Sequence, residues 1–133
     1  MSDREPPRIL IVDDEPFMRT TVKAMLRMIG RFLVMDATDG TDALAKVSSF
    51  KPDLIIFDIG MVPMGGIEFV DRLHEHDDID RRQTAVIMLT ADRNETTIMA
   101  ATRLQLAGYL VKPVSSKKLG TLVNMVFQHL NLV

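Results

Sequence analysis

One stretch decides the fold of this chain: Asp53-Leu54-Ile55-Ile56-Phe57-Asp58. Its apolar residues follow one another without alternation, which favours a strand buried on both faces, as in a parallel sheet covered by helices on each side. Asp58 then stands where the strand leaves the sheet, at the edge where open α/β folds bind their ligands. An aspartate after a strand is also an ordinary turn residue, so its meaning depends on the other strand ends.

Four further apolar segments are predicted to be strands, and segments with helical spacing separate them. The other strands are expected at residues 8–12, 32–35, 85–89 and 109–111. Helices are expected at about residues 15–29, between 38 and 51, and at about 66–75, 93–106 and 115–130. Strand and helix thus alternate five times, with connections long enough for right-handed crossovers. This alternation predicts an α/β fold with a five-stranded parallel sheet and five helices on its two faces.

The predicted helix ends carry local signals. Pro16 suits the first turn of the first helix, where a missing N–H costs nothing. The turn 38–40 holds a candidate N-cap for the second helix. Gly30 is expected just past the end of the first helix, at the position where glycine commonly takes the left-handed conformation.

Length and composition narrow the class of protein. The 133 residues fit one domain, so we expect residues 1–7 to be a disordered lead, residues 8–131 the domain, and no appended output domain. The net charge of −2 gives no reason to expect direct nucleic-acid binding. The absence of cysteine excludes disulfides, thiolate metal sites and cysteine nucleophiles, and it is compatible with a cytoplasmic location. No apolar run approaches a membrane span, and the N-terminus lacks a signal-peptide pattern.

Polar side chains stand at four of the predicted strand ends: Asp13 and Asp14, Asp58, Thr90 and Lys112. Parallel strands end on one edge, so these residues are expected to converge. Carboxylates about 5 Å apart repel by roughly 3 kcal/mol per pair at an effective dielectric near 20, so the cluster holds either protons or a cation. Oxygen ligands suit Mg²⁺ or Mn²⁺. Together with the Thr90 hydroxyl and the Lys112 ammonium, a metal there would bind a phosphoryl group, with Asp58 as the nucleophile.

Five motifs follow one another along the chain, at residues 9–16, 37–44, 52–58, 88–91 and 108–113. With these motifs the sequence resembles the receiver domain of bacterial two-component response regulators, in particular the single-domain, chemotaxis-regulator-like members, and the likeness extends from Arg8 to Leu130. It implies a doubly wound, flavodoxin-like fold with sheet order 2-1-3-4-5.

The resemblance also implies roles for individual residues. Asp58 would be the phosphoacceptor, supplied by a sensor histidine kinase or a histidine phosphotransferase. Asp14 would bind Mg²⁺ or Mn²⁺ directly, Asp13 through water, and Gly60 through its backbone carbonyl. Further roles follow in the same way: Thr90 and Lys112 would contact the phosphoryl oxygens, and Tyr109 matches the switch aromatic of the family.

The chain departs from the family pattern in two places. The family usually has proline at the fourth position and aspartate at the seventh after the acceptor, where this chain has Val62 and Gly65, with Pro63 one place late. Near the end of the fourth helix, Gln105 stands where glycine often caps. It either takes the left-handed conformation at modest cost or the helix ends differently.

The leading hypothesis is a phosphoryl-accepting switch that signals through protein partners. It would not be an enzyme beyond an intrinsic Mg²⁺-dependent autophosphorylation and autodephosphorylation. Alternatives are a receiver cut from a longer DNA-binding or enzymatic regulator, and a degenerate receiver. A flavin carrier disagrees with the acidic residues after the first strand, which would repel phosphate. A phosphatase disagrees with Gly60, because such enzymes normally need a second aspartate there.

Two surface features are open to more than one interpretation. Residues 74–76, His-Glu-His, have a metal-like spacing, but positions i and i+2 diverge on a helix, so we expect a solvated surface. Phe17 and Met18 lie beside the acidic pair. They would form an apolar docking patch with Pro113, or at least one of them would pack in the core.

Overall fold

A computed structural model of the chain describes residues 5–60, 66–75, 84–91, 102 and 105–130. Its centre is a five-stranded parallel sheet with the order β2-β1-β3-β4-β5, as predicted. The strands, in chain order, are β1 (Arg8–Val12), β2 (Leu33–Ala37), β3 (Leu54–Asp58), β4 (Ala85–Thr90) and β5 (Gly108–Val111). The predicted second strand therefore begins one residue later and continues two residues further.

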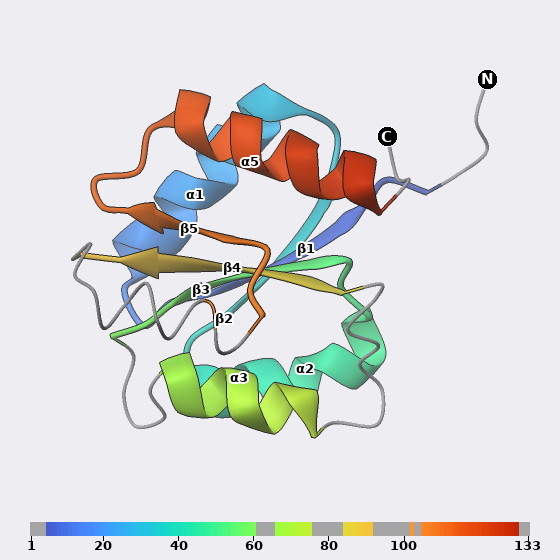
Figure 1. Ribbon diagram of the computed structural model, residues 1–133, viewed down its shortest axis with the longest axis vertical. Helices are drawn as coiled ribbons and strands as arrows, with labels where there is room; N and C mark the ends of the chain where they lie inside the picture. The colour runs from blue at the N-terminus through green and yellow to red at the C-terminus, as the bar shows by residue number, and fades with distance from the viewer. Residues whose placement is uncertain (1–4, 61–65, 76–83, 92–101, 103–104, 131–133) are drawn as a thin grey trace.

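Helices cover both faces of the sheet (Figure 1). Helices α1 (Pro16–Ile29) and α5 (Ser116–His129) lie on one face, and α2 (Gly40–Phe50) and α3 (Gly66–His74) lie on the other. The described part of the chain thus holds four of the five predicted helices, and the predicted helix at 93–106 falls mostly outside it. None of the described helices combines the length and apolarity that crossing a membrane requires.

The core consists of two apolar layers separated by the sheet. Strand β3 lies in the middle of the sheet, and all five of its residues are buried. Leu10, Ile55 and Phe57 face the layer under α2 and α3, whereas Ile9 and Ile56 face the layer under α1 and α5. Both faces of the central strands need apolar side chains, which is why their sequences show runs rather than alternation.

Several predicted helix ends are confirmed. Pro16 lies in the first turn of α1. The Asp39 side chain caps α2 by accepting a hydrogen bond from the Asp42 N–H at 2.8 Å, and Ser115 caps α5 in the same way from the Lys118 N–H at 3.1 Å. These side chains satisfy N–H groups that have no partner within the helix.

Gly30 follows the end of α1 directly, as expected, but its φ of −178° is extended rather than left-handed. The backbone conformation therefore does not demand glycine there. Space is tight: a Cβ at position 30 would lie 3.1 Å from the ring of Phe32, which would have to shift by a few tenths of an ångström. That ring packs against Phe127 of α5 with 5.5 Å between centroids, and the contact joins the start of β2 to the last turns of α5.

The predicted lead, residues 1–7, falls only partly within the described chain. The Pro7 carbonyl accepts a hydrogen bond from the Leu33 N–H at 3.0 Å, and Glu5 pairs with Arg8 at 3.2 Å on the surface. Residues 1–4 lie outside the described residues, and the disorder of the lead stays a prediction.

Two non-glycine residues of the described chain take the left-handed conformation, Lys51 with φ 51° and Gln105 with φ 58°. The first of the two possibilities for Gln105 is therefore correct. Lys51 ends α2, and its N–H donates to the Val47 carbonyl at 2.9 Å. A Cβ in this conformation lies too close to the following carbonyl oxygen, at a cost of roughly 1–2 kcal/mol.

We predict that Lys51→Gly raises the free energy of unfolding by about 1 kcal/mol, because glycine relieves this strain and its own extra freedom in the unfolded chain offsets part of the gain. Urea denaturation measures the change. Lys51→Ala is the matched control, because it removes the charge but keeps the Cβ. A glycine variant no more stable than the alanine variant contradicts the explanation.

Candidate functional site

The polar residues predicted at the strand ends are brought together at one edge of the sheet. Asp13 follows β1, Asp58 ends β3, Thr90 ends β4 and Lys112 follows β5. Registration between neighbouring strands fixes their relative heights: Asp58 pairs with Leu89 and Thr90 with Val111. The carboxyl ends of parallel strands share an edge, so residues distant in sequence become neighbours there.

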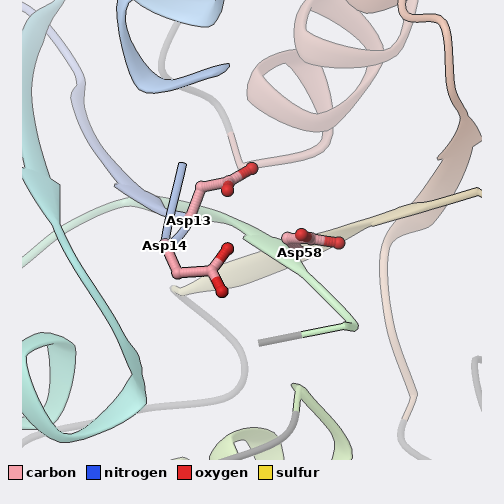
Figure 2. A group of neighbouring side chains, drawn as sticks. All are labelled: Asp13, Asp14 and Asp58. Atoms are coloured by element: carbon pink, nitrogen blue, oxygen red, sulfur yellow. The ribbon is translucent and has the colours of Figure 1, made fainter. Parts of the chain in front are cut away.

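Three carboxylates form the centre of this edge. Asp13 and Asp14 come from the end of β1, and they lie beside Asp58 from β3 (Figure 2). Each contributes an oxygen atom within 4.8 Å of the other two. Asp13 and Asp58 are buried, with 1% and 8% of their surfaces exposed, whereas Asp14 faces solvent. The cluster is therefore accessible from the Asp14 side and closed beneath.

The polar atoms of Asp13 are held by protein groups, except for one. Its N–H donates to the Ala37 carbonyl at 3.2 Å, and its carbonyl accepts from Arg19 Nη1 at 2.7 Å. Its Oδ1 accepts from the Glu15 N–H at 2.9 Å. Oδ2 is buried and has no hydrogen-bond partner among the residues that the structure describes. A buried acceptor without a partner is costly, and a cation would supply one.

Electrostatics at Asp13 supports the same conclusion. Burial raises the pKa of Asp13, and the charges of Asp58 and Asp14 raise it further. The hydrogen bond from Glu15 and the charge of Lys112 lower the pKa, but they do not compensate. The ionised carboxylate is therefore disfavoured in this environment, and the donor set of three carboxylates fits a hard divalent cation such as Mg²⁺ or Mn²⁺.

Within the described chain, Lys112 and Gly60 contact the carboxylate of Asp58. The Lys112 ammonium lies 3.2 Å from Oδ2, in an ion pair that is largely shielded from solvent. The Gly60 N–H donates to Oδ1 at 3.2 Å. Lys112 is positioned by β5 and by its own N–H, which donates to the Thr90 carbonyl at 2.7 Å. Thr90 is itself buried, with 2% of its surface exposed.

The remaining predicted residues have less direct positions. Tyr109 lies in β5 opposite Met88, is half-buried, and packs against the apolar layer under α2 and α3. Gly60 is described, and a Cβ there would lie 3.9 Å from Asp58 Oδ1. Its carbonyl as a metal ligand stays a prediction. The departures at Val62, Pro63 and Gly65 fall outside the described residues.

The surface features are partly resolved by the structure. Phe17 is 78% exposed, whereas Met18 packs against the layer under α1 and α5. The prediction that at least one of the two residues packs in the core is therefore confirmed for Met18. Phe17 and Pro113 are exposed and remain available to a partner. In the histidine-containing segment, Glu75 is exposed and residue 76 lies outside the described chain.

Sequence reasoning missed Arg19, which contacts the backbone of Asp13, and its acidic partner Asp36. A signal was available. Asp36 is a charged residue near the end of a strand, and Arg19 and Lys23 stand four residues apart on the helix before it, so they lie on one face.

The structure defines a class of protein: a doubly wound α/β domain with three carboxylates and a lysine at the carboxyl edge of its sheet. The profile of the response regulator receiver domain family matches residues 9–124. Among solved structures, the chemotaxis protein CheY4 of Vibrio cholerae superimposes with a TM-score of 0.83 at 30% identity, over 92% of this chain and 99% of that one. The chain belongs to the receiver domain family of two-component response regulators.

Curated relatives agree with this assignment. The chain is 32% identical over 120 residues to the nitrate/nitrite response regulator protein NarL of Escherichia coli, and 38% identical over 120 residues to the Regulator of RpoS of the same organism. Each match covers 90% of this chain but only 54% and 34%, respectively, of the relative. The chain thus spans about half the length or less of these relatives.

We predict that Asp13→Asn stabilises the metal-free protein at neutral pH by roughly 1–3 kcal/mol, because it removes repulsion among close carboxylates. The sign follows from the raised pKa of Asp13: the folded state binds the proton more tightly, so stability falls as pH rises through the folded-state pKa. Denaturation with and without Mg²⁺ tests both halves. Mg²⁺ should stabilise the wild type more than the variant, and a variant less stable than the wild type without metal contradicts the prediction.

Proposed function

We propose that this domain is a phosphoryl-accepting switch in which Asp58 is the phosphoacceptor. One observation carries the proposal: Asp58 forms an ion pair with Lys112 at 3.2 Å, and its carboxylate lies within 4.8 Å of the carboxylates of Asp13 and Asp14. In the described chain, no lysine forms an ion pair with either of these two carboxylates. An ammonium and a bound cation beside one carboxylate would suit a phosphoryl group, whose oxygens need neutralising charges from several directions.

The acidic cluster would hold Mg²⁺ or Mn²⁺. Asp14, Asp13 and Asp58 would supply carboxylate oxygens, with the Gly60 carbonyl as a further ligand. When bound, the cation neutralises charge on the phosphoryl oxygens. Support for this comes from Asp13 Oδ2, a buried acceptor without a partner among the described residues, and from receiver domains in general, which bind Mg²⁺ through acidic residues.

The chain's own residues would then perform the transfer mainly by positioning. An oxygen of Asp58 attacks the phosphorus while the bond from phosphorus to the donor nitrogen or oxygen breaks, which leaves an acyl phosphate on Asp58. The Lys112 ammonium and the Thr90 hydroxyl would contact the oxygens of the transferred group. Acetyl phosphate would serve as a small-molecule donor, and water would later attack the same phosphorus, so both self-phosphorylation and self-dephosphorylation would require the metal.

Partners follow from the family. Receiver domains interact with histidine kinases and with downstream targets. For this chain we propose a sensor histidine kinase or a histidine phosphotransferase as donor, a protein target as output, no direct nucleic-acid contact, and a cytoplasmic location. Because the chain spans about half the length or less of its curated relatives, a place within a longer DNA-binding or enzymatic regulator remains the second candidate.

Acetyl phosphate is expected to label Asp58 only when Mg²⁺ or Mn²⁺ is present. Intact-mass measurement detects the added phosphoryl group, and lability to alkali or hydroxylamine identifies an acyl phosphate. Asp58→Asn should abolish labelling, whereas the matched control Asp71→Asn, which changes an exposed aspartate of α3, should label like the wild type. Wild-type labelling of Asp58→Asn, or an acid-stable linkage, contradicts the assignment.

The output of the switch is proposed to pass through Thr90 and Tyr109. Phosphorylation would draw the Thr90 hydroxyl toward the phosphoryl group, and the space left beside β4 would let Tyr109 turn inward. Tyr109 is half-buried next to β4, so the core does not enclose its ring completely, which supports the proposed movement. Such a change is a shift of population between two states rather than a new fold.

Tyr109 is the one tyrosine of the chain, so its ring signals in an NMR spectrum report directly on this step. We predict that beryllofluoride with Mg²⁺ shifts these signals in the wild type. Thr90→Ala should still bind the mimic but should show a much smaller shift of the tyrosine ring, because the hydroxyl link is lost. Equal shifts in both proteins rule out a coupling through Thr90.

A further inference from the structure

Arg19 joins the acidic site to the edge strand β2. It lies in the second turn of α1, and its side chain is only 15% exposed. Nη1 donates to the Asp13 carbonyl at 2.7 Å, and Nε donates to Asp36 Oδ2 at 3.2 Å. A guanidinium presents donors in fixed, divergent directions, so one side chain can hold two acceptors in a set relative position.

Asp36 is a fixed anchor for this bridge. Lys23 Nζ lies 2.9 Å from the same Oδ2, and Lys46 Nζ donates to the Asp36 carbonyl at 2.8 Å. Burial alone would raise the pKa of Asp36, but the hydrogen bond from Lys23 and the charges of Lys23, Arg19 and Lys46 lower it on balance. The carboxylate is therefore ionised and held from several sides, and its backbone pairs with β1 opposite Ile11.

The segment after β1 is thus attached to the end of β2 by two links. One is the hydrogen bond from the Asp13 N–H to the Ala37 carbonyl at 3.2 Å, and the other is the Arg19 bridge. Between them they fix the peptide groups on both sides of the Asp13 Cα. On that fixed backbone, the Glu15 N–H holds Oδ1 of the carboxylate, which sets the direction of Oδ2, the buried atom without a partner in the described chain.

We infer that Arg19 is a positioning residue for metal binding: its bridge from the Asp13 carbonyl to the Asp36 carboxylate holds the Asp13-Asp14 segment in the geometry that receives the cation. The inference rests on the proposed function of the acidic cluster. Arg19 touches neither the cation nor the phosphoryl group in this account and acts through the backbone of Asp13. Residues that orient metal ligands from behind typically change metal affinity about 10–100-fold when they are replaced.

The sign of the effect separates positioning from simple charge. A positive charge near a cation site opposes cation binding. If Arg19 acted by charge alone, the protein would therefore bind Mg²⁺ more tightly after Arg19 is replaced. A purely structural Arg19 would change the stability of the metal-free protein and leave the affinity unaltered. Of these three roles, only a positioning role predicts that the protein binds Mg²⁺ more weakly once the positive charge of Arg19 is lost.

The experiment compares Arg19→Met with Lys23→Met, using calorimetric titration of the full chain with Mg²⁺ alone. Both variants remove a positive charge that pairs with Asp36, and both keep a long apolar side chain at the substituted position. Of the two residues, only Arg19 contacts Asp13. We expect Arg19→Met to bind Mg²⁺ about tenfold more weakly than the wild type. Lys23→Met should bind like the wild type, because Arg19 still holds the Asp36 carboxylate and Lys46 still holds its carbonyl. Hydrogen exchange adds a metal-free readout: the Glu15 amide, which donates to Asp13 Oδ1, should exchange faster in Arg19→Met only.

The inference is overturned if Arg19→Met binds Mg²⁺ as tightly as the wild type, or more tightly, or if Lys23→Met weakens binding equally. Arg19→Lys decides by the same criterion if Arg19→Met does not fold, because a single ammonium can pair with Asp36 but lacks the fork that holds both acceptors. A wild type that fails to bind Mg²⁺ refutes the proposed metal site itself. Wild-type binding together with an unaffected Arg19 variant refutes only the role of Arg19.

Discussion

Repulsion among Asp13, Asp14 and Asp58 is the constraint on which the rest of the site depends. Their oxygens come within 4.8 Å of one another, and two of the three side chains are buried, so water screens the charges poorly. Such a cluster persists only because the sheet and its neighbours hold it in place. Lys112 offsets part of the charge at Asp58, and the remaining negative charge supports the proposed divalent-cation site at this edge.

The fold provides that restraint through its central strand. Every residue of β3 is buried between two apolar layers, so Asp58 cannot move away from the charges beside it without loss of core packing. Asp13 is held by contacts to β2, α1 and its own following turn. The apolar core and the charged edge are therefore linked: the packing of the core holds the carboxylates close together, and a bound cation would relieve the repulsion between them.

The sheet order was expected from the resemblance to receiver domains. The sequence itself predicted the meeting of the strand-end residues, because buried runs form parallel strands and parallel strands share an edge. It failed where the reason was a contact rather than a pattern. Gly30 follows the helix as the sequence predicts, but its backbone is extended, and a side chain there would press against the ring of Phe32. The Arg19–Asp36 bridge joins a helix to a strand, so the pairing itself depends on the tertiary fold, although the charged residues that form it are visible in the sequence.

A crystal structure of the protein with Mn²⁺ and beryllofluoride tests the central claim most directly, because the anomalous signal of manganese locates the ion independently of the refined protein. The account predicts one strong peak at about 2.1–2.2 Å from carboxylate oxygens of Asp14 and Asp58, with Asp13 within one water of it, and beryllofluoride on Asp58 next to Lys112. A manganese peak away from this edge, or beryllofluoride on another side chain, would contradict it.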